Sequence, residues 1–124
     1  MVCGADCLGN CERKQSREHV VSESLWQSNT VMVQGFSWCA DAPKEVGIAN
    51  LTYKILCRKH NSALSPVDAS AGQSFDMLRE VARLKSVRES MKPIRWNVKR
   101  YILDGIMLER WFLKTLINIA FDGK

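Results

Sequence analysis

The stretch ILCRKHNSALSPVD, residues 55–68, decides which fold this chain can adopt. Two residues separate Cys57 from His60, which is a spacing that allows one tight turn to present both side chains to zinc. Asn61 follows directly, and asparagine is not a usual zinc ligand, so the stretch serves two sites. The zinc pair predicts a second pair of ligands elsewhere in the chain.

That second pair lies near the N-terminus, in CLGNC, where Cys7 and Cys11 flank a turn-forming Gly-Asn. Thiolate and imidazole are the ligands that zinc prefers in four-coordinate structural sites. Cys3 has the same spacing from Cys7, so one of these three cysteines is surplus. The alternative for Cys57 is a small buried residue at a strand end. With both pairs present, the sequence favours structural Zn²⁺ held by Cys7, Cys11, Cys57 and His60.

The composition is that of one globular domain. The chain has 124 residues, of which 46% are hydrophobic, and a formal net charge of +5. Five cysteines are an odd number, which argues against a disulfide framework and for metal binding in a reducing compartment. No secretory leader and no apolar run of membrane-spanning length is apparent. We therefore expect a soluble cytoplasmic protein without a membrane partner.

The signals of secondary structure change near residue 70. Short β-branched and aromatic runs in TVMVQGFSW and NLTYKILC predict strands, with an exposed loop between them. Ser65, Pro66 and Asp68 are typical of a helix start, and apolar periodicity predicts a helix over residues 75–91. Residues 101–121 predict a second helix that needs cover on most sides. Either a homodimer through this helix or a longer chain would supply that cover.

Basic residues concentrate between positions 83 and 100. This stretch holds seven lysines and arginines against one acid, Glu89. Such a surface suits a phosphate backbone, although a solvated helix face explains the same run about equally well.

A further stretch, SREHVVSESLW at residues 16–26, brings in a family resemblance. Together with the cysteine pairs, Asn50 in ANLTYKILC and the His60-Asn61 dipeptide, its Glu18-His19 pair resembles the HNH endonuclease family. That family carries an acid-histidine dipeptide on its first strand, an asparagine before the second strand and a closing His or Asn after a ligand pair. Asn61 makes this chain an HNN variant. The resemblance covers about residues 7–70.

The resemblance implies an α+β fold, with a small zinc-stabilised ββα-metal (treble-clef-like) core over residues 1–70. Residues 71–124 lie outside the resemblance, and their charge and apolar periodicity predict a basic helical extension. The resemblance also implies a metal-dependent endonuclease that hydrolyses phosphodiester bonds. His19 would be the general base, Glu18 and Asn61 would hold Mg²⁺ or Mn²⁺, and Asn50 would fix the loop around His19.

The expected partner is nucleic acid, in the form of DNA. Candidate phosphate contacts are Arg17, Arg58, Lys59, Lys92, Arg95, Lys99 and Arg100. The alternative is a catalytically silent zinc module that binds nucleic acid or another protein.

Overall fold

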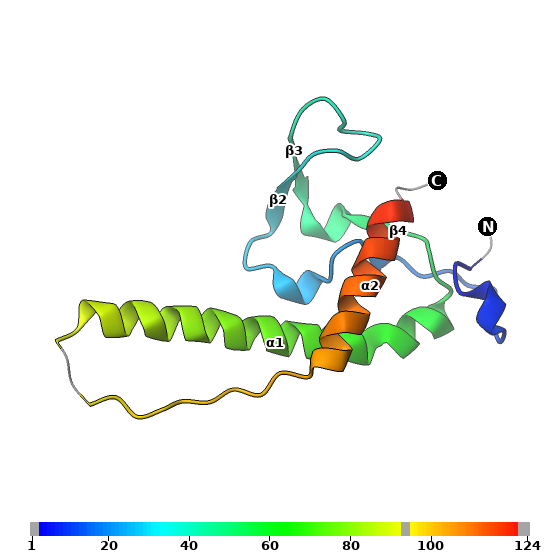
Figure 1. Ribbon diagram of the computed structural model, residues 1–124. Helices are drawn as coiled ribbons and strands as arrows, with labels where there is room; N and C mark the ends of the chain where they lie inside the picture. The colour runs from blue at the N-terminus through cyan, green and yellow to red at the C-terminus, as the bar shows by residue number, and fades with distance from the viewer. Residues whose placement is uncertain (1–2, 93–94, 122–124) are drawn as a thin grey trace.

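The computed structural model of the protein describes residues 3–92 and 95–121, which form an α+β fold. Two helices, α1 (Arg58–Ser90) and α2 (Gly105–Phe121), cross one another, and two small antiparallel sheets lie beside the first half of α1 (Figure 1). The second half of α1 projects away from the sheets, and the chain returns along it before α2 begins.

The two sheets have two strands each. β1 (Glu18–His19) pairs with β4 (Thr52–Tyr53), with Glu18 opposite Tyr53 and His19 opposite Thr52. β2 (Thr30–Val33) pairs with β3 (Lys44–Gly47) in a hairpin. Short 3₁₀ turns, η1 (Asp6–Leu8), η2 (Glu23–Leu25) and η3 (Ile48–Asn50), connect these segments. β4 directly precedes α1, while the β2–β3 hairpin lies between β1 and β4 in the chain.

The two apolar runs each contain a strand, and a further strand forms in the loop predicted between them. The strands of the two runs, β2 in the first and β4 in the second, do not pair with each other. The partner of β2 is β3, which lies within the stretch expected to be an exposed loop. Register explains this, because Val31 opposite Val46 places two β-branched side chains across the hairpin.

Helix α1 begins eight residues earlier than the Ser65-Pro66 signal predicts, since its N-cap is Cys57 and not Ser65, so that prediction of the helix start was wrong. Cys57 is the N-cap, and its Sγ accepts a hydrogen bond of 3.5 Å from the His60 backbone N–H. Pro66 lies inside the helix, where its ring removes one N–H donor. The helix start is therefore set by the cap at Cys57, and Pro66 is accommodated within the helix. The helix predicted over residues 75–91 is the second half of α1, and the helix predicted from residue 101 begins at Gly105.

The core consists of two clusters that α1 connects. Cys3, Ile55, Leu56 and Cys57 form the first cluster, beneath the N-terminal segment. Val67, Ala71 and Trp111 form the second, where α2 crosses α1. The Trp111 ring packs edge-on against Phe75, with 5.4 Å between ring centroids. Because α1 runs without a break through residue 70, the predicted domain boundary lies inside one helix.

The two faces of α2 reverse the usual amphipathic arrangement. Lys114 and Asn118, part of the helix's polar stripe, are buried at 8% and 3% exposure. The opposite face exposes apolar side chains, namely Ile106, Phe112, Leu113, Leu116, Ile117 and Ile119. In the part of the chain that the structure describes, no helix is long and apolar enough to cross a membrane. The homodimer through residues 101–121 stays a prediction.

Candidate functional site

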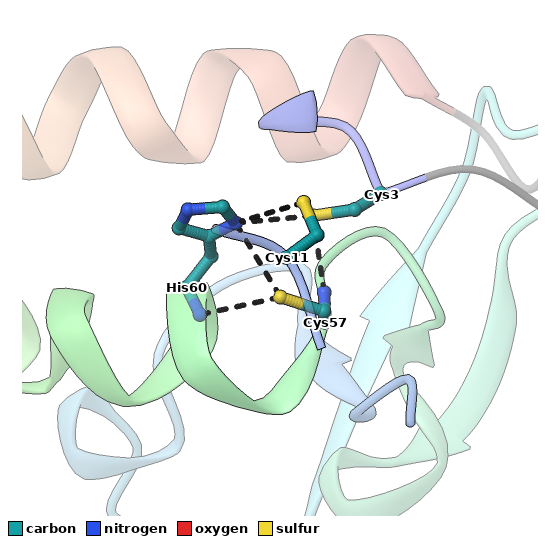
Figure 2. Close-up of side chains that lie close together, drawn as sticks. All are labelled: Cys3, Cys11, Cys57 and His60. Atoms are coloured by element: carbon teal, nitrogen blue, oxygen red, sulfur yellow. Dashed lines mark hydrogen bonds between the residues drawn. The ribbon is translucent and has the colours of Figure 1, made fainter. Parts of the chain in front are cut away.

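Three thiols and one imidazole converge where the N-terminal segment meets the start of α1. Cys3, Cys11, Cys57 and His60 each offer one ligand atom, and these atoms all lie within 4.8 Å of one another. Figure 2 shows the three sulfur atoms gathered around one edge of the His60 ring. Among residues 3–92 and 95–121, this is the only group of three or more His, Cys, Asp or Glu side chains placed to share a metal ion.

The distances fit a tetrahedral zinc site. His60 Nδ1 lies 3.4 Å from Cys3 Sγ, 3.5 Å from Cys11 Sγ and 3.4 Å from Cys57 Sγ. A tetrahedron with Zn–S of about 2.3 Å and Zn–N of about 2.0 Å has a sulfur–nitrogen edge of roughly 3.5 Å. One imidazole nitrogen cannot satisfy three thiols at once by hydrogen bonding. The chemistry and spacing of the donor set therefore fit a structural metal such as zinc.

Backbone contacts fix these ligands before any metal binds. The Gly4 N–H donates to the Ile55 carbonyl at 2.7 Å, and the Cys57 N–H donates to Cys3 Sγ at 3.2 Å. The positive φ angles of Gly9 (72°) and Asn10 (54°) then turn the chain so that Cys11 returns to the cluster. The N-terminal segment is thus held side by side with the chain that leads into α1.

Two thiols of the cluster have opposite pKa shifts. Burial raises the pKa of Cys3, but hydrogen bonds from the Cys57 backbone, His60, the Ala5 backbone and Cys11 outweigh it and bring the pKa down to about 6. Burial also raises the pKa of Cys11, and the neighbouring Cys3 and Cys57 add to this, giving a pKa of about 12. Thiolates packed this closely repel one another, so the full set of thiolates needs a cation among them.

Cys7, which the sequence analysis placed among the zinc ligands, is not in this cluster. It lies in the turn η1, its side chain is exposed, and Cys3 takes its place. The spacing of three residues between Cys7 and Cys11 suggested a short knuckle. The bonds from Gly4 and Cys57 instead draw Cys3 against the start of α1. Of the three N-terminal cysteines, Cys7 is therefore the surplus one.

A cavity of about 340 Å³ is lined in part by Asn61, the residue next to the ligand His60. Its lining residues are Arg17, Glu18, His19, Ser22, Glu23, Ser24, Asn61, Ser65 and Asp68. The structure thus brings Glu18, His19 and Asn61 to one cavity, although 42 positions separate His19 from Asn61. His60 points to the ligand cluster while its neighbour Asn61 lines the cavity.

The side chains of His19 and Asn61 have defined surroundings. His19 Nε2 lies 3.7 Å from Glu23 Oε2 and has no hydrogen-bond partner among the described residues. The Asn61 amide nitrogen donates to Ser16 Oγ at 2.9 Å and to the Arg17 carbonyl at 3.3 Å. Because the nitrogen makes these bonds, the carboxamide oxygen is the atom that would meet a cation. The Nε2 atom of His19 is buried and has no such bond within the described part of the chain.

The remaining predicted residues are dispersed. Asn50 lies in η3 and is exposed, away from the cavity lining. Arg58 and Lys59 are exposed on the first turn of α1, and Arg17 lines the cavity. Lys92, Arg95, Lys99 and Arg100 are exposed in the segment between α1 and α2. Lys99 contacts Glu80 at 3.4 Å, which ties the returning chain to α1.

Sequence reasoning missed the residues behind the cavity. Glu18 is 4% exposed and forms an ion pair with Lys114, which also contacts Asp68 at 2.6 Å. The Asn118 amide donates to the His19 carbonyl at 3.1 Å. The only signal for these contacts was the polar stripe at four-residue spacing on the last helix, and a stripe alone does not say which face is buried.

Comparisons with protein-family models, with curated proteins and with solved structures find no match for this chain. The functional interpretation therefore rests on the geometry of the ligand cluster and of the cavity.

Proposed function

We propose that this protein is a metal-dependent nuclease of the HNH type, with a structural zinc and a ββα-metal core. The observation that carries the proposal is the shared first turn of α1. His60 joins the thiol cluster, while Asn61 lines a cavity with Glu18 and His19. The order of β1, β4 and α1 supports the same core.

In the proposed reaction, His19 accepts a proton from the water that attacks the phosphorus atom. Imidazole as a chemical group suits this role, because it exchanges protons readily near neutral pH. The Nε2 atom of His19 has no competing hydrogen bond among the described residues. The cavity has room for a phosphate group and a water molecule, and Arg17 on its lining would contact a phosphate oxygen.

Glu18 and Asn61 would hold Mg²⁺ or Mn²⁺ through oxygen atoms, the ligands that these cations prefer. Mg²⁺ characteristically keeps several waters and takes one or two carboxylates from the protein, so two protein ligands are a sufficient set. When bound, the cation would supply charge stabilisation at the phosphate and leaving oxygen.

The rest of the proposal concerns how DNA would be held. The exposed basic residues between α1 and α2, together with Arg58 and Lys59 at the start of α1, would contact the phosphate backbone. The projecting half of α1 supports this, because it carries Arg83, Lys85 and Arg88. This half of the helix extends well beyond the sheets (Figure 1).

A second candidate is a zinc-stabilised module that binds nucleic acid or protein without cleaving it. The ion pair between Glu18 and Lys114 favours this candidate. A carboxylate already paired with an ammonium is a weaker ligand for a second cation.

One preparation can separate the two candidates. We would measure zinc content, then cleavage of plasmid and single-stranded DNA with Mg²⁺ or Mn²⁺ and with EDTA. The nuclease proposal expects divalent-dependent cutting that His19→Ala abolishes while zinc content and DNA binding stay unchanged. His60→Cys is the matched control, because it removes the other histidine of the chain and leaves four zinc-binding side chains. Zinc-loaded protein that does not cut would favour the binding module.

A further inference from the structure

We infer that α2 is a working part of the candidate catalytic site, and that Asn118 and Lys114 are positioning residues for His19 and Glu18. The inference rests on the proposed function, because His19 and Glu18 are catalytic residues only in the proposed nuclease reaction. It places behind the cavity lining a helix that lies outside the family resemblance, because α2 contacts Glu18, His19 and Ser22.

Asn118 fixes the backbone of the proposed general base. Its side chain is 3% exposed, and its amide donates to the His19 carbonyl at 3.1 Å across 99 positions of sequence. β1 is only two residues long, and β4 is its only ladder partner among the described strands. A strand this short has few bonds of its own, so one buried bond from α2 strongly constrains where the His19 ring can lie.

Lys114 fixes the acidic wall of the cavity. Its side chain is 8% exposed, and the ammonium group contacts the carboxylates of Glu18 and Asp68. Both carboxylates also line the cavity. The Glu18 carboxylate is buried and the Asp68 carboxylate is half-buried, so one ammonium holds two acidic side chains from different elements in place. Two carboxylates against one ammonium leave an excess of acidic groups, which favours a cation on the cavity side.

Trp111 lies one helical turn before Lys114 and makes a third contact between α2 and the cavity lining. Its indole N–H donates to Ser22 Oγ at 2.8 Å, and the Ser22 hydroxyl in turn donates to Asp68. Positions 111, 114 and 118 share one face of the helix, and each contacts a residue of the cavity lining or its backbone. The three contacts therefore act on the same short segment, residues 18–22, from one rigid element.

Packing alone does not account for this choice of residues. Burying an ammonium and a carboxamide costs free energy that apolar side chains would not incur. The same helix has Leu113, Leu116 and Ile117, and all three are exposed. Lys114 and Asn118 thus lie beside Trp111 on the inward face although apolar residues of the same helix stay exposed, which is the pattern of a surface that orients a site.

The test compares Asn118→Leu and Lys114→Met with Leu116→Asn, a control on the outward face of the same helix. We expect kcat for plasmid cleavage with Mn²⁺ to fall about 10²-fold in both inward variants, with KM and zinc content unchanged. Lys114→Arg should recover part of the loss. The control should cleave like the unchanged protein.

Amide hydrogen exchange supplies a readout that does not need activity. Exchange of residues 16–22 should rise roughly tenfold in Asn118→Leu, as loss of one buried hydrogen bond implies. If exchange rises but kcat does not change, α2 only stabilises the fold and the inference is overturned. Unchanged exchange overturns it as well. If the wild-type protein does not cut DNA, the nuclease proposal fails separately. The exchange measurement alone then decides whether α2 holds β1 in place.

Discussion

The Nδ1 atom of His60 lies 3.4 Å from the Sγ atom of Cys3, although 57 positions separate the two residues. This contact joins the N-terminal segment to the first turn of α1. Because the same turn positions Asn61 at the cavity, the ligand cluster and the cavity are mechanically linked. A metal in the cluster would therefore fix the backbone on which the proposed catalytic residues depend.

The first prediction separates the N-terminal cysteines. Cys3→Ser should lose bound zinc and lower the melting temperature, because it removes one of four ligands from a structural site. Cys7→Ser should keep zinc and stability, since Cys7 is exposed and outside the cluster. Elemental analysis and thermal unfolding of both variants check this. Zinc loss in Cys7→Ser but not in Cys3→Ser would make Cys7 the ligand and Cys3 the surplus thiol.

The second prediction concerns pH. In the metal-free protein the pKa of Cys11 is about 12, so zinc binding near neutral pH must displace its proton. The pKa of Cys3 is about 6, so this thiol competes for protons only as pH falls through that value. Zinc affinity should thus decrease as pH is lowered, most steeply below pH 6. Calorimetry in buffers of different ionisation enthalpy should detect the released proton, and a pH-independent affinity would contradict the assignment.

Sequence patterns predict the features of this molecule that depend on residues close together in the chain, and they miss contacts between distant residues. Cys57, His60 and the 75–91 helix were predictable because spacing and periodicity act over a few residues. The choice of Cys3 over Cys7 depended on a backbone bond between Gly4 and Ile55, which no local pattern encodes. Asn118 was missed for the same reason, because its partner is 99 positions away.

The third prediction tests the junction of the helices. Trp111→Ala should lower the free energy of unfolding by about 3–5 kcal/mol, because it empties a buried site against Phe75, Val67 and Ala71. Trp96→Ala, at a tryptophan that is 41% exposed, should cost less than about 1 kcal/mol. Urea unfolding of the two variants gives the comparison. Equal losses of unfolding free energy in the two variants would mean that the crossing of α1 and α2 is not part of the core.

The fourth prediction concerns the basic surface. Changing Lys92, Arg95 and Arg100 together to Gln should weaken DNA binding and reduce the slope of log K against log salt by roughly 0.9 for each phosphate that the variant no longer neutralises. Lys44→Gln with Lys54→Gln is the control, since both lysines are exposed on the sheet side of the molecule. Binding titrations at several salt concentrations measure the slope. An unchanged slope in the triple variant would mean that these three basic side chains face solvent and do not contact DNA.

The fifth prediction concerns the apolar face of α2. Leu113 and Ile117 are 56% and 65% exposed on the same side of the helix. If two copies of the chain pair through this face, its apolar side chains leave water and the mass in solution becomes concentration-dependent. Sedimentation equilibrium should then show a dimer, and Leu113→Glu with Ile117→Glu should return the protein to a monomer. Met32→Glu, at a residue 61% exposed on β2, makes the same kind of change away from α2 and should leave the dimer intact. A monomer at every concentration would remove the homodimer and leave this face available to a different partner.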